Sequence, residues 1–171
     1  MTRKTPEWLR GRRDTCEERF SFLIAEFGYR RSLRRFRWGG FQLGYLGRGA
    51  GVLAEWFPRD GVMVWLLPLD PGDLPANWGG PGGPKGFDLG FVAAAAGNQL
   101  AVRDEDVYNA TDQALTALAG LLRASGHSML RGDYAQVPAI SDLIRRRAEA
   151  PRKGQLHPSP GGRAEDRSGR D

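Results

Sequence analysis

Residues 29–45 interleave arginines with aromatic side chains, a combination that can bind nucleic acid or an acidic protein surface. Sheet proteins that bind RNA stack bases on exposed aromatic rings and contact the phosphates with cations. An acidic protein would instead be recognised by matching charge. A third interpretation is structural, because charged residues also protect an edge strand from aggregation. The residues concerned are Arg30, Arg31, Arg34, Arg35 and Arg37, together with Phe36, Trp38, Phe41 and Tyr45.

The spacing of these arginines bears on the choice. In a regularly alternating strand, Arg30 and Arg34 point away from Arg31 and Arg35. The arginines then fall on both faces, and the pattern does not predict a continuous basic stripe. A solvated or paired edge strand explains the pattern best, with some arginines bonded to Asp or Glu from the acidic middle of the chain. We rank an acidic protein partner second and nucleic acid third.

Catalytic and metal-binding patterns are weak. Cys16 is the sole cysteine and lies on an apolar helical stripe, which indicates a buried structural thiol. It and the two histidines, His127 and His157, are too far apart in the sequence to form a zinc pattern. The run GGPGGPKG at 79–86 lacks the amide donors of a phosphate loop, and no Ser or Thr follows Lys85. We therefore expect no enzyme, no metal and no cofactor, although a site built from carboxylates leaves no signature in one sequence.

A tryptophan lies inside the Gly/Pro-rich segment 70–86. Trp78 is expected to pack on the domain as a latch, or else to remain exposed for a partner. The candidate partner-binding residues are therefore Arg34, Arg35, Arg37 and Trp78.

The charge of the chain is unevenly distributed. Residues 1–48 carry 12 Lys or Arg and 5 Asp or Glu, whereas residues 49–144 carry 5 and 11. This layout suits polar partners or a dipolar surface. Residues 1–150 are expected to form one domain, with a Gly/Pro-rich loop at 70–86, and residues 151–171 a disordered charged tail. We expect a cytoplasmic protein, because there is no secretory signal, no apolar run that could span a membrane and no possible intramolecular disulfide.

The elements that must position these residues begin with a helix. Apolar residues at helical spacing predict one helix that ends at Phe27, with Gly28 in the left-handed position that follows a helix. Four short strands are predicted next, over residues 29–38, 41–45, 52–57 and 61–67. Short turns join them, and such links require antiparallel neighbours. The sequence therefore predicts a four-stranded antiparallel meander.

Two or three helices are expected after the meander, all on one face of the sheet. Asp88 caps a short Ala-rich helix, and a longer helix runs from about Asp104 to a stop at Gly126. Pro138 opens the last helix, and the cations at 145–147 suit the negative end of its dipole. The fold class is α+β.

Two stretches carry a resemblance to a known group. FSFLIAEFGYR at 20–30 precedes the meander, and MLRGDYAQVPAISDLIRRR at 129–147 closes the domain. Together they resemble small uncharacterised bacterial proteins, some of which are treated as immunity-like partners of secreted toxins. The resemblance implies a cytoplasmic α+β protein without known catalytic residues. On this basis we expect a non-catalytic, immunity-like binding module whose partner is an acidic protein such as a toxin domain, with nucleic acid as the alternative partner.

Overall fold

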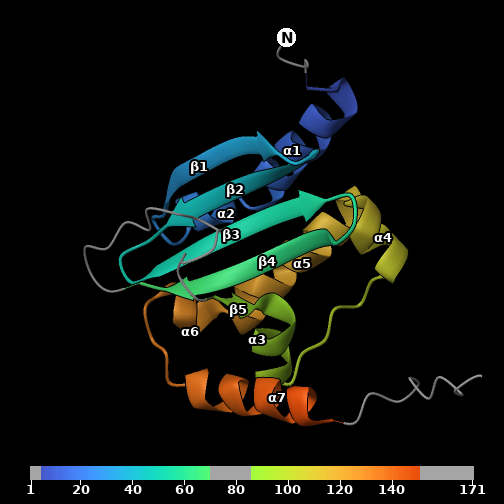
Figure 1. Ribbon diagram of the computed structural model, residues 1–171. Helices are drawn as coiled ribbons and strands as arrows, with labels where there is room; N and C mark the ends of the chain where they lie inside the picture. The colour runs from blue at the N-terminus through green and yellow to red at the C-terminus, as the bar shows by residue number, and fades with distance from the viewer. Residues whose placement is uncertain (1–4, 70–85, 151–171) are drawn as a thin grey trace, which may run out of the picture.

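The computed structural model describes residues 5–69 and 86–150. Trp78, the predicted loop 70–86 apart from Gly86, and the predicted tail 151–171 lie outside the described residues. An N-terminal helical segment leads into an antiparallel sheet, and further helices follow, as Figure 1 shows. The α+β class is thus confirmed. The elements are α1 (Glu7–Arg19), α2 (Phe22–Ala25), β1 (Arg30–Arg37), β2 (Gly40–Leu46), β3 (Ala50–Phe57), β4 (Gly61–Pro68), β5 (Phe87–Asp88), α3 (Leu89–Ala95), α4 (Asp104–Asn109), α5 (Asp112–Ser125), α6 (His127–Leu130) and α7 (Val137–Glu149).

The sheet is a meander in which each strand pairs with the next one along the chain. Its order is β1-β2-β3-β4-β5, and every pair is antiparallel. The four predicted strands are confirmed. The fifth strand was not predicted, because Phe87 and Asp88 are too few to show alternation; they pair with Leu66 and Trp65 of β4.

The prediction of one continuous N-terminal helix is wrong. The chain leaves α1 after Arg19, and the amide of Ser21 bonds the carbonyl of Glu18 in a tighter turn before α2 begins. Apolar spacing does not reveal this break, because Phe20 and Leu23 are fully buried on either side of it. The helical segment still ends where predicted, with Gly28 at a φ of 68°.

The helix predicted from Asp104 to Gly126 is also divided. Ala110 adopts a left-handed conformation (φ 50°, ψ 49°), which ends α4. Thr111 then caps α5, its hydroxyl accepting a hydrogen bond from the amide of Ala114 at 3.2 Å. Threonine often caps the start of a helix, so Thr111 could have indicated that a new helix begins there. Because Thr111 also falls on the apolar stripe, it was instead assigned to the interior of one long helix.

The main core lies between one face of the sheet and the helices. In Figure 1, α1, α2 and α5 lie behind β1 to β4. Inward residues alternate along each strand and meet apolar residues of these helices, as a half-covered antiparallel sheet requires. Members from the sheet include Phe41, Leu43, Tyr45, Val52, Ala54, Trp56, Val64 and Leu66, and members from the helical segments include Leu9, Cys16, Phe20, Leu23, Leu115 and Leu122.

We call the other side of the sheet the open face, because no helix of the described residues lies over it (Figure 1). Helices on one face were predicted, and this is confirmed. The open face is nevertheless not uniformly exposed to solvent. Leu46, Leu53 and Leu67 form a second cluster there and are only 2–6% exposed, with Leu33 and Trp65 packed beside them.

Two buried tyrosines give a matched test of this core. The Tyr45 hydroxyl is buried and finds no hydrogen-bond partner among the described residues, whereas the Tyr29 hydroxyl donates to the Leu130 carbonyl at 3.0 Å. An unsatisfied buried donor costs about 1–3 kcal/mol, and a made hydrogen bond contributes about 1 kcal/mol. Tyr45→Phe is therefore expected to raise the free energy of unfolding by about 1 kcal/mol, measured by urea denaturation.

Tyr29→Phe is the control and is expected to lower the free energy of unfolding by a similar amount, because it leaves the Leu130 carbonyl without its donor. Equal destabilisation by both substitutions would contradict the described surroundings of Tyr45.

Candidate functional site

One extra residue in β1 decides where its arginines point. Arg31 is opposite Tyr45 and Leu33 is opposite Gly44, so Ser32 is a β-bulge with no partner in the register. Its hydroxyl donates to the Gly44 carbonyl at 3.2 Å. A bulge shifts the alternation of side chains by one residue. The prediction that Arg31 and Arg34 lie on opposite faces is therefore wrong, and both turn toward the helices.

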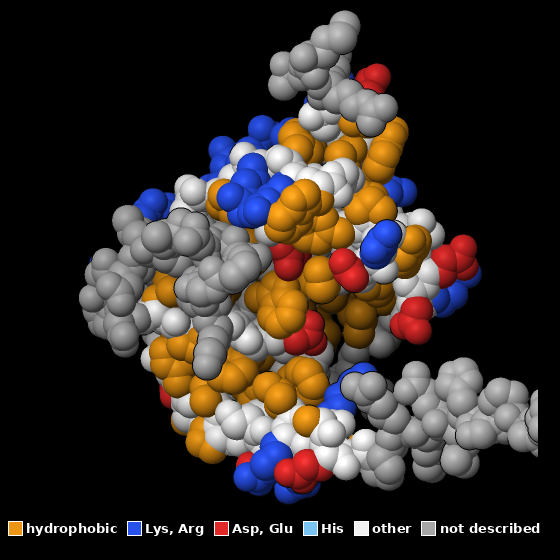
Figure 2. Space-filling view, in the orientation of Figure 1, with side chains coloured by type: hydrophobic (Ala, Val, Ile, Leu, Met, Phe, Trp, Pro, Cys, Tyr) orange, Lys and Arg blue, Asp and Glu red, His pale blue; other side chains and the backbone are white. Residues whose placement is uncertain are grey.

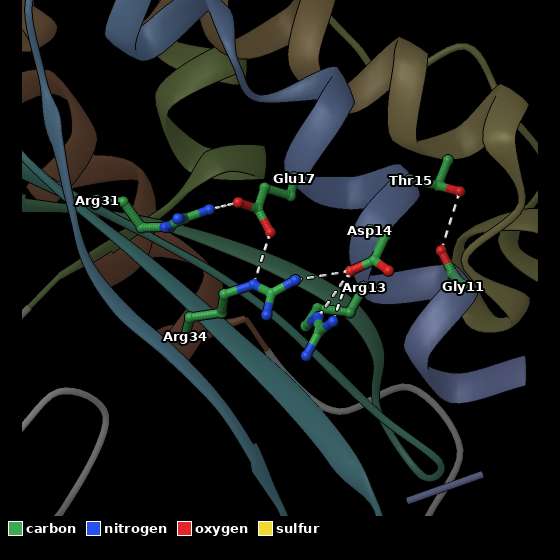
Figure 3. Close-up of polar contacts among 7 residues, drawn as sticks. All are labelled: Gly11, Arg13, Asp14, Thr15, Glu17, Arg31 and Arg34. Atoms are coloured by element: carbon green, nitrogen blue, oxygen red, sulfur yellow. Dashed lines mark hydrogen bonds and ion pairs between the residues drawn. The ribbon is translucent and has the colours of Figure 1, made fainter. Parts of the chain in front are cut away.

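The two arginines on the helix side are neutralised by α1. Arg31 and Arg34 both form ion pairs with Glu17, the latter through Nε at 2.8 Å, and Arg34 also reaches Asp14 at 3.0 Å (Figure 3). Asp14 in turn accepts from Arg13, a nearly buried cation. Pairing of β1 arginines with carboxylates was expected from the acidic middle of the chain, but these partners come from the N-terminal helix. Arg34, a candidate partner contact, is thus engaged within the chain.

The remaining arginines of β1 lie on the open face. Arg35 donates from Nε to the Oε1 atom of Gln42 at 2.6 Å. The guanidinium carbon of Arg37 lies 3.6 Å from the ring centroid of Trp38. Arg30 and Arg37 form no ion pair with any residue in the described ranges. In Figure 2, Lys and Arg side chains gather at one side of this face, beside hydrophobic side chains.

Trp38 occupies an unusual backbone position at the tip of the β1–β2 hairpin. Its φ is 50° and that of Gly39 is 75°, so both central residues of the turn are left-handed. Such turns favour Asn-Gly, and a bulky residue there is strained by about 1–2 kcal/mol. The side chain is nevertheless 67% exposed. Of the aromatics considered for base stacking, Phe41 and Tyr45 are fully buried on the helix side.

A pocket of about 430 Å³ lies beside Trp38 on the open face. Its walls come from the β1–β2 turn, from β2, β3 and β4, and from the β3–β4 turn. The lining residues are Trp38, Gln42, Glu55, Phe57, Pro58, Arg59, Asp60 and Met63.

Two buried polar side chains form the floor of this pocket. Gln42 is 1% exposed and Glu55 is 7% exposed, although both lie on adjacent strands of the open face. Gln42 Nε2 donates to one oxygen of Glu55 at 2.7 Å, and Trp65 Nε1 donates to the other at 3.0 Å. Because Arg35 occupies the Gln42 oxygen, it orients the Gln42 amide group so that its nitrogen faces Glu55.

The turn at the rim of the pocket is anchored to α4. Trp56 Nε1 donates to the Tyr108 carbonyl at 2.7 Å, and the Tyr108 hydroxyl donates to the Pro58 carbonyl. Gly61 lies so close to α4 that a Cβ atom would come within 2.8 Å of the Tyr108 Cα atom. These contacts hold the β3–β4 turn, with Arg59 and Asp60, in a fixed position against the sheet.

Sequence reasoning missed the floor and most of the rim. The available signal was a polar residue at an outward position of a strand, flanked on both sides by apolar residues. Gln42 lies between Phe41 and Leu43, and Glu55 lies between Ala54 and Trp56. Such residues are typical of a solvated face, and their burial follows from tertiary packing. Of the candidate partner contacts, Arg35 and Arg37 lie near this pocket through Gln42 and Trp38, Arg34 lies on the opposite side of β1, and Trp78 lies outside the described residues.

The lining residues of the pocket contain no Ser, Thr, Cys, Lys or His, and its acidic side chains are those of Glu55 and Asp60. His127 instead packs its ring against Phe27. Cys16 is fully buried as predicted, and burial raises the pKa of its thiol to about 12. Within residues 5–69 and 86–150, no three His, Cys, Asp or Glu side chains are grouped to hold a metal ion.

Comparisons with protein-family models, with curated proteins and with solved structures find no match. None of the helices that the structure describes is long and apolar enough to cross a membrane.

The ion pairs of Glu17 with Arg31 and Arg34 are expected to contribute measurably to the free energy of unfolding. Glu17→Gln removes the carboxylate that pairs with Arg31 and Arg34, and Glu17 is the least exposed member of the set at 22%. Because exposed pairs contribute up to about 1 kcal/mol each, we expect a loss of about 1 kcal/mol in the free energy of unfolding. The loss should shrink at high salt, which screens the pairs.

Asp142→Asn is the matched control, because Asp142 pairs with Arg145 on the exposed surface of α7. It is expected to change stability by no more than about 0.5 kcal/mol. If the two substitutions have the same small effect by urea denaturation, α1 does not hold β1 through Glu17.

Proposed function

We propose that this protein is a non-catalytic, immunity-like binding module of the bacterial cytoplasm that binds an acidic protein partner, such as a toxin domain. The partner binds the open face, around Trp38 and the arginines of β1. The observation that carries this proposal is the division of the arginines by face. The cations on the helix side are paired with Glu17 and Asp14, whereas Arg30 and Arg37 on the open face have no such carboxylate among the described residues.

Charge complementarity explains why such a layout suits a protein partner. Unpaired cations at the margin of an interface accelerate association with an acidic surface and exclude basic ones. They contribute most when they surround an aromatic anchor, because Trp and Arg are over-represented among the residues that dominate binding energy. Trp38 and Arg37 provide this combination, with the guanidinium stacked on the ring.

The strain at Trp38 supports the same assignment. Trp38 adopts a left-handed backbone conformation at the tip of the hairpin, and its side chain remains 67% exposed although it contacts Arg37 and Phe57. Strained positions concentrate at sites where binding uses the side chain. The β1–β2 hairpin therefore presents Trp38 outward at a cost to stability.

Nucleic acid is the alternative partner, favoured by the same exposed ring and cations. A base-stacking sheet needs several exposed aromatic rings. In β1 and β2 the rings of Phe41 and Tyr45 face the helices, and Phe36 packs under the guanidinium of Arg13. We therefore favour the protein partner.

Site-specific crosslinking in the cells that produce the protein tests this proposal. Trp38 is replaced by the photoreactive amino acid p-benzoylphenylalanine, and adducts formed on irradiation are identified by mass spectrometry. We expect a specific adduct with one acidic protein. The same replacement of Ile24, which is 48% exposed on α2, is the control and should give no such adduct.

Charge reversal at Arg30 and Arg37 should lower the yield of this adduct, whereas Arg146→Glu on the exposed end of α7 should leave it unchanged. A nucleic-acid adduct at position 38 would favour the alternative partner. Equal adducts from positions 38 and 24 would refute a binding site on the open face.

A further inference from the structure

Glu55 is a buried carboxylate that pairs with no cation of the described residues. It is 7% exposed, and both of its described hydrogen bonds come from neutral donors, Gln42 and Trp65. No ion pair to it occurs within the described residues. Burying an ionised carboxylate without a paired cation is unfavourable. Each oxygen accepts one of these bonds and retains capacity for a second donor.

The walls of the pocket are suited to a cation as well. The rings of Trp38 and Phe57 have centroids 6.1 Å apart and planes inclined at 45°. Aromatic faces attract cations, and Trp attracts them most strongly. The guanidinium of Arg37 on Trp38 shows that this ring accepts a planar cation at close range. Asp60 adds a second acidic side chain at the rim.

We infer that this pocket receives an arginine side chain of the protein partner, with its guanidinium against Glu55 and the rings of Trp38 and Phe57. This inference rests on the proposed function, since it names one contact that the partner makes. It also defines the expected surface of the partner, which presents one arginine beside a carboxylate. The arginine enters the pocket and the carboxylate faces Arg37, while Arg30 lies at the other end of β1.

Guanidinium fits this site better than the ammonium of lysine. Its planar fork presents parallel N–H donors to the two oxygens of a carboxylate, and it stacks on aromatic rings. It is also more weakly hydrated than an ammonium group, so its transfer from water into the pocket costs less hydration free energy. The volume of about 430 Å³ admits the side chain together with part of the backbone that carries it.

One group in the pocket opposes a cation. Arg59 lines the rim and forms no ion pair with a described residue, so its charge repels an entering guanidinium. Removing it should strengthen binding, whereas a pocket for an anion would be weakened by the same change. Arg59→Ala therefore distinguishes the sign of the ligand charge.

Binding of a short peptide to the full-length protein tests the inference without the partner. The probe is the capped tripeptide acetyl-Gly-Arg-Gly-amide, and its control is the citrulline peptide, which has nearly the same shape and no charge. Chemical shifts of the Trp38 and Trp65 indole N–H groups report binding by NMR. We expect a dissociation constant of about 1 mM for the arginine peptide and at least tenfold weaker binding for citrulline.

Variants locate the site. Glu55→Gln should weaken the arginine peptide about tenfold or more, as loss of a charge-assisted hydrogen bond predicts, and Arg59→Ala should strengthen it a few-fold. Trp38→Asn is also expected to abolish binding, because it removes the aromatic ring. Asn is favoured in this left-handed turn position, so this variant tests the site even if Glu55→Gln disturbs the strand. Glu149→Gln, at the exposed end of α7, is the charge control and should bind as the parent protein does.

Equal binding of the arginine and citrulline peptides, or no binding of either, would overturn the inference. If neither peptide binds while position 38 still crosslinks to an acidic protein, the proposed function stands and only the arginine contact fails. If the arginine peptide binds at Glu55 but position 38 crosslinks to no protein, the cation pocket stands and the proposed function fails.

Discussion

The bulge at Ser32 is the constraint on which the open face depends. It places Arg31 and Arg34 three residues apart on the same side of β1, where the carboxylates of α1 neutralise them. Without it, the residues beyond position 32 would turn to the other face, since a one-residue shift reverses every side chain. The bulge therefore both fastens the edge strand to the helix layer and leaves Arg35 and Arg37 on the open face.

The open face combines features that lower the stability of the fold and that a purely structural surface would avoid. Gln42 and Glu55 place an amide and a carboxylate in a buried position on strands whose other open-face residues are Gly, Leu or Phe. Trp38 holds a left-handed backbone and exposes a large ring. Native proteins are only marginally stable, so features of this kind persist chiefly where function uses them. Their convergence on one pocket is the reason to locate binding there.

Residue pattern alone predicted the class of fold and the order of the strands. Alternation in β2 and β3, the nearly continuous apolar run of β4, the turn residues between strands and Asp88 at the start of α3 are local signals, and they predicted these elements. The breaks at Arg19 and Ala110 were missed because the apolar spacing continues across them. The site was missed for a different reason. The burial of Glu55 arises from contacts across three strands, and the bulge at Ser32 is a register shift that no local pattern marks.

The most direct test of this account is the rate at which the Nε–H protons of individual arginines exchange with water, measured by NMR on the free protein. The account predicts slow exchange at Arg34, whose Nε–H donates to Glu17 at 2.8 Å, and fast exchange at Arg30 and Arg37. Exchange at Arg34 as fast as at Arg30 would contradict it. The bulge would then not sort the arginines of β1 between a neutralised side and a binding side.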